Sequence, residues 1–589
     1  MVEFKRLFDA VYYQQEHYPQ PDAVAEKKNG QWIKYSASEV IEKSNLISRA
    51  LYGYGIRPGD NLAIVSNSRP EWNWVDMGMM QIGAINVPVY PNINPDEYIY
   101  IFNEAEIKVL FVSDELLFKK IQSIRHLIPK VKEIFTFDEV KNALNLNDLL
   151  KYAEGVTQQQ INNISADIGE NQLATIIYTS GTTGTPKGVM LSHKNIVSNI
   201  KSAASVLPIH ETMRVLSSLP VCHIFERLAC FLFMYKGMPL YFAEGVETIA
   251  DNLKEVKPTF FTTVPRLLER VYEKILATGK KLTGIKKTLF DWALNLGLRY
   301  DPDKNQGALY YAQLAIANKL VFNKWREALG GNVVGIVSGA AALQPRLARV
   351  FSAAGIPVKE GYGQTEASPV ISINLFGKGD WRIGTVGPPL PNVEIKIAED
   401  GEILVKGPNV MLGYYKNHDL TKEAIDADGY LHTGDVGIMD GKFLKITDRK
   451  KELFKTSGGK YIAPQVIENK FRESFFIDQV MVVGENKKTV SALIVPAFPH
   501  LQEWCAVNGL KFETREEMLA HEKVLKKYAE IRDELNRNLS DIERIRQFSL
   551  LNDEWTVHTG EITPTLKLKR KMIMEKYKSQ IAGLYREKE

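Results

Sequence analysis

Residues 178–188 read YTSGTTGTPKG and follow an apolar run that contains Ala174, Ile176 and Ile177. A buried strand that enters a loop of glycines, hydroxyl side chains and one lysine offers backbone N–H groups, hydroxyl donors and a cation to an anion. The glycines allow a close approach of the backbone, and Lys187 adds a mobile positive charge. The stretch is not a Walker A loop, because Pro186 stands where that pattern needs the glycine before its lysine. The sequence therefore predicts a strand followed by a polyphosphate-binding loop.

With this loop the chain resembles the adenylate-forming superfamily, which includes acyl-CoA synthetases, luciferases and peptide-synthetase adenylation domains. The resemblance implies that ATP activates a carboxylate as an acyl-adenylate before the acyl group passes to a thiol. It also implies that Thr179 supplies an oxygen near a Mg²⁺ ion. The residues that match the family's phosphate loop are Thr179, Ser180, Gly181, Thr182, Thr183, Gly184 and Lys187.

A second motif, GYGQTE at residues 361–366, follows a predicted strand over residues 358–360. Tyr362 offers an aromatic face, Thr365 a hydroxyl donor, and Glu366 a hard oxygen ligand of the kind that Mg²⁺ prefers. By the resemblance, Tyr362 packs against adenine, Thr365 contacts the α-phosphate and Glu366 binds Mg²⁺. The nucleotide-binding residues implied here are Gly361, Tyr362, Gly363, Gln364 and Thr365.

Small residues at Ser338, Gly339, Ala340 and Ala341 match a turn at a strand end that borders the adenine and the acyl group in the family. We expect Gly339 and Ala340 to contact the nucleotide. Tight packing is the other explanation for small residues at such a turn.

The segment LPVCHIFER, residues 219–227, resembles the acyl-pocket segment of the family. The resemblance gives His223 the role of an aromatic that shields the adenylate or opens the path of the thiol. A lone histidine beside apolar residues is also a common core residue. The HIFER form and a helical insertion at about residues 277–320 resemble long-chain fatty acyl-CoA synthetases more than acetyl or aryl enzymes.

Two further motifs follow. In HTGD, residues 432–435, the family's aspartate accepts both ribose hydroxyls, which assigns this role to Asp435, and Arg449 resembles the arginine that also reaches the ribose. Asp448 matches the hinge about which a small domain swings between adenylate-forming and thioester-forming poses. In the second pose Gly458, Gly459 and Lys460 would border the pantetheine of coenzyme A.

The last motif is TPTLKLKRK, residues 563–571. The family ends with Pro-x-Thr-x-x-Gly-Lys, whose lysine neutralises charge during adenylation. This chain has a shorter form without the glycine. Aligned from the basic run that follows, Lys567 takes the catalytic role and Lys569 is the alternative. A lysine-rich C-terminus is otherwise a solvated tail.

Length and local pattern predict the architecture. A chain of 589 residues is too long for one core. Apolar runs at 62–65, 84–89 and 109–112 alternate with helical segments, such as 71–81 and the one after the capping box at Ser36 and Glu39. The fold class is therefore α/β. We expect a large N-terminal domain of parallel-sheet layers with helices on both faces and a small β-rich subdomain (residues 1–447). A smaller, mobile α+β C-terminal domain (residues 448–589) follows, with strands at 479–483 and 491–495 and helices over 515–546.

Composition limits the partners. A net charge of +4 gives no case for nucleic-acid binding, and three cysteines favour a reducing cytoplasm over a disulfide framework. No run of about 18 apolar residues marks a membrane span. Lys280, Lys281, Lys286 and Lys287 beside aromatic residues fit either a surface that meets anionic lipid or a solvated helical face. Peripheral membrane contact and a homodimer are left open.

The sequence therefore predicts an AMP-forming long-chain fatty acid–CoA ligase, with ATP, Mg²⁺ and coenzyme A as cofactors and a fatty acid as substrate. The predicted catalytic residues are Lys567, Glu366, Thr179 and His223, and Thr179 and Glu366 are the predicted metal ligands. A ligase that stops at the adenylate, one that uses a carrier protein, and a medium-chain or aryl acid CoA ligase are the alternatives.

Overall fold

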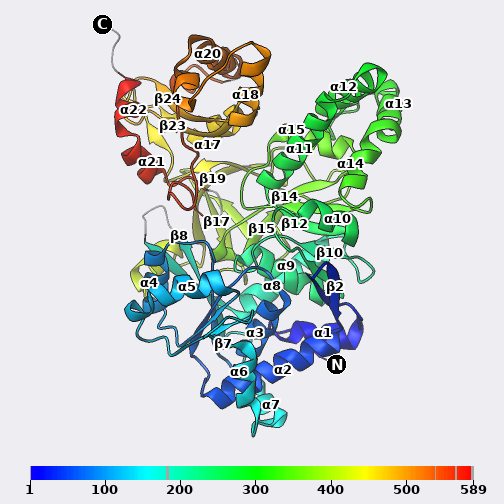
Figure 1. The fold of residues 1–589 in the computed structure, drawn as a ribbon, viewed down its shortest axis with the longest axis vertical. Helices are drawn as coiled ribbons and strands as arrows, with labels where there is room; N and C mark the ends of the chain where they lie inside the picture. Colours follow the sequence, from blue (N-terminus) through cyan, green and yellow to red (C-terminus); the bar gives the residue numbers. More distant parts are fainter. Residues whose placement is uncertain (1, 181–184, 538, 564–566, 586–589) are drawn as a thin grey trace. The chain divides into compact units, whose positions relative to one another are not determined.

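The computed structural model describes residues 2–180, 185–537, 539–563 and 567–585. The chain divides into two compact units, which are drawn as a ribbon in Figure 1. Unit 1 comprises Met1–Lys396, Leu404–Thr433 and Met439–Lys445, and unit 2 comprises Ile397–Ile403, Gly434–Ile438 and Ile446–Glu589. Among the described residues, no helix combines the length and the apolar character that crossing a bilayer requires.

The first sheet of unit 1 has the strand order β18-β9-β8-β4-β3-β5-β6-β7. Its parallel strands are β3 (Asn61–Val65), β4 (Ile85–Val89), β5 (Val109–Val112), β6 (Glu133–Thr136), β7 (Leu144–Asn145) and β8 (Leu173–Ser180). Strands β9 (Pro186–Ser192) and β18 (Gly413–Tyr414) extend it in antiparallel sense. Every residue of β3, β4 and β5 is buried. Continuous burial is expected of parallel strands covered on both faces, so the predicted layering is confirmed.

The second sheet of unit 1 has the order β15-β14-β13-β12-β10-β11-β1-β2. Its parallel strands are β1 (Val24–Lys28), β10 (Val215–Ser217), β11 (Leu240–Phe242), β12 (Phe260–Thr263), β13 (Gly335–Ser338) and β14 (Val358–Gly363). Strands β2 (Gln31–Tyr35) and β15 (Val370–Ile373) pair antiparallel at its two edges. The carboxyl ends of β10, β12, β13 and β14 therefore lie at one edge of this sheet.

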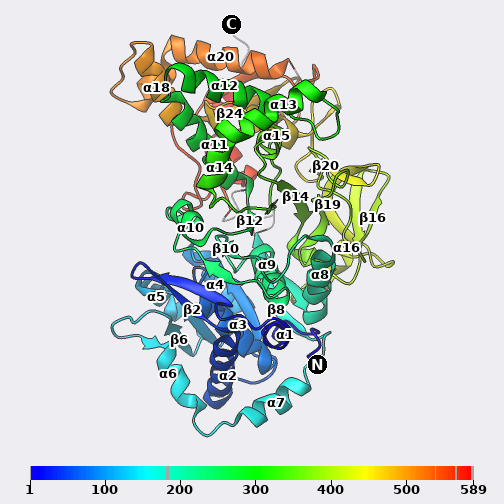
Figure 2. The same cartoon turned by 90° about the vertical axis from the view of Figure 1, so that its right-hand side faces the viewer.

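Helices cover both sheets (Figure 2). Helix α2 (Ala37–Tyr54) begins with the predicted capping box of Ser36 and Glu39. All residues of α3 (Pro70–Gln81) and nearly all of α9 (Ile224–Tyr235) are buried, as expected for helices enclosed within a domain. The remaining helices before residue 260 are α1 (Asp9–His17), α4 (Pro95–Glu104), α5 (Glu115–Ser123), α6 (Leu146–Leu150), α7 (Gln158–Ala166), α8 (His193–Val206) and α10 (Ile249–Val256).

The predicted helical segment after β12 is confirmed. It comprises α11 (Pro265–Lys280), α12 (Gly284–Arg299), α13 (Ala308–Ala317), a π-helical turn over Asn318–Phe322 and α14 (Asn323–Ala328). Helix α15 (Pro345–Ala353) follows β13, and its buried residues Leu347, Val350 and Phe351 share a core with Phe290 and Leu296 of α12.

A four-stranded sheet in the order β16-β17-β19-β20 matches the predicted small β-rich subdomain. Its strands are β16 (Glu394–Ile397), β17 (Glu402–Lys406), β19 (Leu431–Asp440) and β20 (Phe443–Arg449), with α16 (His418–Ala424) between β17 and β19. The division into two units passes through these strands.

The remainder of unit 2 is an α+β body around β23 (Ile477–Val483), β24 (Val490–Pro496) and β25 (Ile545–Leu550). Its helices are α17 (Pro464–Phe471), α18 (Phe498–Val507), α19 (Arg515–Ala520), α20 (Glu522–Asn536), α21 (Arg570–Lys576) and α22 (Lys578–Gly583), and β21 (Phe454–Lys455) and β22 (Tyr461–Ile462) form a hairpin. The expectation of helix as far as residue 546 was wrong. Helix α20 ends at Asn536, and β25 pairs parallel to β24, because Ile545 is buried beside Val490.

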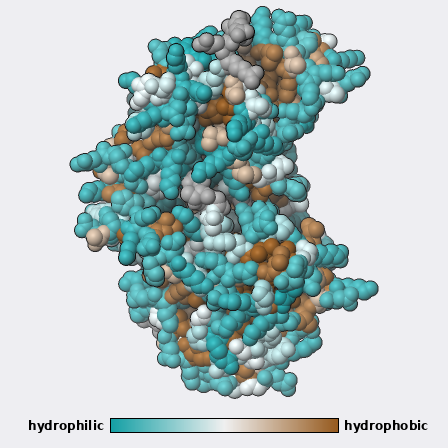
Figure 3. All heavy atoms as spheres, turned by 90° about the vertical axis from the view of Figure 1, so that its left-hand side faces the viewer, coloured by the Kyte–Doolittle hydropathy of each residue, from teal (hydrophilic) through white to brown (hydrophobic). Residues whose placement is uncertain are grey.

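One face of the surface is drawn in Figure 3. Hydrophilic residues dominate it, and hydrophobic residues form separate groups among them.

Candidate active site

The phosphate-loop motif joins β8 to β9. These strands form an antiparallel pair in which Thr179 lies opposite Lys187. The predicted residues Gly181, Thr182, Thr183 and Gly184 lie outside the described residues. The two strands thus hold the start and the end of the loop at neighbouring positions in one sheet.

Lys187 lies next to a tyrosine that links it to the second motif. Its Nζ is 5.3 Å from the ring centroid of Tyr414, a cation–π distance. The hydroxyl of Tyr414 donates a 2.9 Å hydrogen bond to Oε1 of Glu366. Burial and the Glu366 carboxylate raise the pKa of Tyr414 above its ordinary value, so the hydroxyl remains a donor. The structure therefore brings together the predicted residues Lys187 and Glu366 around Tyr414.

Tyr414 was missed by sequence reasoning. It lies in β18, whose Tyr414 pairs with Val189 of β9, and it is 8% exposed. The local signal is only a Gly-Tyr-Tyr triplet at residues 413–415, which is too common to identify a site residue.

The GYGQTE motif begins inside a strand. Strand β14 continues through Gly363 and pairs with β15, with an irregularity in register between Tyr362 and Gly363. A Cβ atom at Gly363 would lie 1.7 Å from the carbonyl oxygen of Pro369, so only glycine fits at this position. Glu366 then lies in a short 3₁₀ turn, Thr365–Ala367, in which Thr365 is buried. The strand and the turn together fix where Glu366 stands.

The Ser338–Ala341 turn follows β13 directly. The Gly339 N–H donates to the carbonyl of Thr263 at the end of β12. A Cβ atom at Gly339 would lie 3.2 Å from the ring of Phe225. Ala340 has φ of +68°, an uncommon backbone conformation for a residue with a side chain. Tight packing on Phe225 thus accounts for the glycine, while the exposed Ala340 is the strained position.

His223 caps the helix that follows it. Its Nδ1 accepts a 3.1 Å hydrogen bond from the N–H of Phe225 at the start of α9. Its ring centroid lies 6.4 Å from that of Tyr90, which follows β4. The HIFER segment therefore stands beyond the carboxyl end of β10, the same edge at which Gly339 lies.

The charged residues of HIFER are buried. Glu226 accepts hydrogen bonds from the hydroxyls of Ser217 in β10 and Thr262 in β12, both at 2.5 Å. Burial raises the pKa of Glu226 to about 7. These bonds tie the first turn of α9 to two strands of the second sheet.

Arg227, next in sequence, forms a two-point ion pair with Asp76 of α3, with N–O distances of 2.6 and 3.0 Å. Asn86 of β4 donates to the same carboxylate at 2.7 Å. Arg227 and Asp76 are almost completely buried. The pair fixes α9 against α3, and neither contact was predicted from sequence.

In unit 2, the two predicted ribose-binding residues pair with each other. Arg449 Nε lies 3.2 Å from Oδ1 of Asp435, which is buried. Asp448 precedes this arginine and is 1% exposed. Burial raises the pKa of the Asp448 carboxyl to about 7. A carboxyl group is thus buried at the predicted hinge.

The other predicted residues of unit 2 lie in turns. Gly458, Gly459 and Lys460 form the exposed turn between β21 and β22, where Gly459 has φ of +74°. Lys567 is exposed, and its N–H donates to Oγ1 of Thr563. Lys569 is half-buried and stands at the start of α21. Pro564, Thr565 and Leu566 lie outside the described residues.

The predicted Mg²⁺ ligands fit a hard cation in kind. Oε1 of Glu366 accepts from Tyr414, and a carboxylate with both oxygens can also bind a metal. Within the ranges that the structure describes, no group of three or more His, Cys, Asp and Glu side chains could hold a metal ion. Mg²⁺ commonly binds through one or two carboxylates and the phosphates of a substrate, so such a group is not required.

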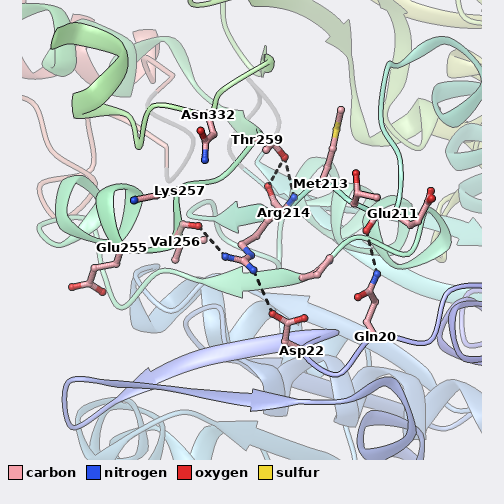
Figure 4. Close-up of a pocket in the computed structure, with 12 residues that line it drawn as sticks. Gln20, Asp22, Glu211, Met213, Arg214, Glu255, Val256, Lys257, Thr259 and Asn332 are labelled. Atoms are coloured by element: carbon pink, nitrogen blue, oxygen red, sulfur yellow. Dashed lines mark hydrogen bonds and ion pairs between the residues drawn. The ribbon is translucent and has the colours of Figure 1, made fainter. Parts of the chain in front are cut away.

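A cavity of about 620 Å³ in unit 1 lies elsewhere (Figure 4). Arg214 and Thr259 in its lining stand just before β10 and β12, at the amino ends of these parallel strands. Two of its lining residues, Arg214 and Asp22, form an ion pair with 3.8 Å between Nη2 and Oδ2. Ligands of open α/β sheets bind outside the carboxyl ends of the strands. The motifs meet at that edge, so this cavity is not the candidate active site.

Comparison with known proteins agrees with the motifs. The family model described as AMP-binding enzyme matches residues 12–415, and that described as AMP-binding enzyme C-terminal domain matches residues 452–589. A long-chain-fatty-acid–CoA ligase of Mycobacterium bovis is 33% identical over 96% of this chain and 95% of that protein. The human long-chain-fatty-acid–CoA ligase 1 is 33% identical over 94% of this chain and 82% of that protein.

The fold agrees as well. The crystal structure of ATP-bound MatB from Rhodopseudomonas palustris superposes with a TM-score of 0.72 over 98% of this chain and 100% of that one, at 22% identity. The family model covers more than half of the chain, and relatives at 33% identity span nearly all of it. The predicted resemblance is confirmed, and the chain belongs to the AMP-binding enzyme family.

Proposed function

We propose that this chain joins a long-chain fatty acid to coenzyme A at the expense of ATP, through an acyl-adenylate, with release of AMP and pyrophosphate. The observation that carries the proposal is the grouping of Lys187 and Glu366 around Tyr414 beside the β8–β9 loop. A cation, a carboxylate and a glycine-rich loop are what a Mg²⁺-bound triphosphate needs. The relatives that match nearly the whole chain bear the name long-chain-fatty-acid–CoA ligase.

The roles follow from charge. A carboxylate and a triphosphate repel each other, so cations and N–H donors must screen the attack on the α-phosphorus. Lys187, Thr179 and the loop N–H groups hold the phosphates, Glu366 and Thr179 hold Mg²⁺, and Lys567 neutralises charge on the attacking carboxylate. The metal supplies charge stabilisation when bound. The chain needs no nucleophile of its own.

The proposal also assigns residues to the nucleoside. In this proposal Tyr362 stacks on adenine beside Gly339, Ala340 and Gly361, and Thr365 contacts the α-phosphate. Asp435 accepts from the ribose hydroxyls, a role suited to a carboxylate. Its ion pair with Arg449 holds the carboxylate in one orientation.

The second half-reaction belongs to a rotated pose of a C-terminal domain, residues 448–589, against residues 1–447. Asp448 is the proposed hinge, Gly458, Gly459 and Lys460 border the pantetheine, and His223 opens the thiol path. Asp448→Pro fixes φ near −65°. We expect this variant to retain adenylation and to lose thioester formation, measured by rapid quench of each half-reaction.

One assay separates the alternatives for acceptor and acyl chain. AMP release is measured with and without coenzyme A across saturated acids from acetate to stearate. Each buried methylene contributes about 0.8 kcal/mol, roughly fourfold, so kcat/KM should climb steeply with chain length. AMP release without dependence on coenzyme A favours an adenylate or carrier-protein ligase. Acetate or butyrate equal to palmitate overturns the long-chain proposal.

The cellular compartment and the oligomeric state are proposed on fewer observations. Cys222, Cys230 and Cys505 are buried free thiols, which supports a reducing compartment such as the cytoplasm. A homodimer remains a prediction.

A further inference from the structure

The predicted catalytic lysine, Lys567, stands in one arm of a small hairpin in unit 2. We call residues 561–569 the lysine hairpin. Ile562 and Leu568 form an antiparallel bridge between its arms, and the N–H of Thr563 donates a 2.8 Å hydrogen bond to the carbonyl of Lys567. The place of Lys567 within unit 2 is therefore set by the contacts that fix this hairpin to its surroundings.

Arg570 follows the lysine hairpin directly and begins α21. Its Nη2 donates to both carboxylate oxygens of Glu468 in α17, each at 2.6 Å, and its Nε donates to Oε2 of Glu452 at 3.2 Å. Its Nη1 lies 3.4 Å from the carbonyl oxygen of Val482 in β23. All three charged side chains are largely buried. Because the guanidinium is planar and rigid, these contacts hold the arginine in one orientation.

Glu452 connects Arg570 to the predicted hinge. It lies four residues after Asp448, and its N–H donates a 2.9 Å hydrogen bond to the carbonyl of Arg449. The Arg570 guanidinium also acts on the hinge residue through space, because its charge opposes the rise that burial causes in the pKa of the Asp448 carboxyl. Glu452 and Arg570 are 118 residues apart in sequence. One arginine thus ties the lysine hairpin to the segment that follows the hinge.

We propose that Arg570 is a positioning residue for adenylation, which locks the lysine hairpin to the segment after Asp448 so that Lys567 and the hinge turn as one body. All the contacts that carry this inference lie within unit 2. It rests on the proposed function, since it takes Lys567 as the lysine of adenylation and Asp448 as the hinge. Displacement of a catalytic group by about 1 Å can cost on the order of a hundredfold in rate, so the anchoring of the hairpin affects the reaction directly.

Two variants of the full chain test this role. Arg570→Met removes the contacts to both glutamates, whereas Glu452→Met removes only the link to the hinge segment and leaves Arg570 paired with Glu468. We expect kcat for pyrophosphate exchange to fall by about tenfold or more in the first variant and about fivefold in the second, with KM for ATP and fatty acid within about threefold of wild type. Thioester formation from supplied acyl-adenylate should also stay within about threefold, because Lys567 has no part in that step of the proposed function.

Arg532→Met is the matched control. Arg532 of α20 is an arginine of unit 2 with 21% of its side chain exposed, against 16% for Arg570. It donates to the carbonyl of Arg546 at 2.9 Å and so joins α20 to β25. Its loss should leave pyrophosphate exchange within about threefold of wild type. Melting temperatures are measured for all three variants. If Arg570→Met slows both half-reactions equally and the control does the same, Arg570 only stabilises the fold and the proposal is wrong.

A double-mutant cycle with Lys567→Ala decides whether Arg570 acts through that lysine. If it does, adding Arg570→Met to Lys567→Ala should slow exchange by less than about threefold further, whereas losses that multiply overturn the proposal. Glu452→Met takes the place of Arg570→Met in the cycle if the arginine variant does not fold. A wild type that exchanges pyrophosphate with no fatty acid refutes the proposed function, and this inference with it. Exchange that is present in wild type and kept within about threefold by both variants refutes the role of Arg570 alone.

Discussion

Tyr414 and Glu366 are 48 residues apart in the chain, and a 2.9 Å hydrogen bond from the tyrosine hydroxyl to the glutamate carboxylate joins them. The bond connects β18, an edge strand of the first sheet, to the 3₁₀ turn after β14 of the second sheet. Glu366 is thus held from two sheets at once. A carboxylate oriented in this way needs little rearrangement to bind a metal–phosphate ligand.

Removing the Tyr414 hydroxyl should weaken adenylation through Glu366. A hydrogen bond to a charged group contributes about 1.5–3 kcal/mol, so Tyr414→Phe should lower the pyrophosphate-exchange rate by about tenfold or more and raise the Mg²⁺ concentration needed for half-maximal rate. Tyr415→Phe is the matched control, because it removes the hydroxyl of the neighbouring tyrosine. That hydroxyl accepts a 3.4 Å hydrogen bond from Nδ2 of Asn61. Equal losses in the two variants would contradict a specific role for Tyr414.

Glu366→Gln tests the metal ligand itself. The amide keeps an acceptor for Tyr414 but lacks the charge that binds Mg²⁺, so pyrophosphate exchange should fall by a hundredfold or more, equivalent to several kcal/mol of lost stabilisation. Thermal unfolding should stay near that of wild type. Exchange within about threefold of wild type would refute the assignment of Glu366.

The buried carboxyl of Glu226 should make stability depend on pH. Its pKa is about 7 in the folded protein and near 4.5 when exposed. The folded state therefore holds the proton more tightly, and this stabilisation is complete below pH 4.5 and is lost as the pH rises to about 7. Glu226→Gln has no such proton, so its stability relative to wild type should rise by up to about 3 kcal/mol across that range.

The measurement is the melting temperature of wild type and Glu226→Gln at several pH values. The carboxyls of Glu360 and Asp448, whose pKa values burial also raises to about 7, titrate in both proteins and cancel in the difference. A difference that does not change with pH would show that Glu226 is ionised in the fold.

Lys567 and Lys569 can be separated by half-reactions. Lys567→Ala should slow acyl-adenylate formation by about a hundredfold or more, as expected when a charge directed at the transition state is removed, and should leave thioester formation from supplied adenylate unchanged. Lys569→Ala is the paired variant. If it alone slows adenylation, the catalytic lysine is Lys569 and the shortened motif has been aligned wrongly.

Local signals predicted much of the fold. The apolar runs at 62–65 and 109–112 are strands β3 and β5, and the helix expected over 71–81 is α3. The capping box at Ser36 was equally local. Strand β25 was not predictable in this way, because only its partner β24 distinguishes it from the helices before it.

In the candidate site, too, residues in local motifs could be named from the sequence, whereas residues defined by distant partners could not. Glu366 and Lys187 stand in recognisable motifs, so both were named as candidate site residues from the sequence, and the structure places both beside Tyr414. Tyr414 could not be identified, since its role exists only through a pairing with β9 and a bond to Glu366. Glu226 and Arg227 sat in a recognised motif, yet their partners are as much as 151 residues away.

The ion pair between Asp76 and Arg227 has a consequence for biosynthesis. A ribosome delivers Asp76 151 residues before Arg227, an interval of about 8–30 s at ordinary rates of translation. Until α9 emerges, burying the Asp76 carboxylate of α3 away from water would leave an uncompensated charge in the interior. We therefore expect the nascent first half of unit 1 to keep α3 hydrated, or Asp76 protonated, until Arg227 has left the exit tunnel.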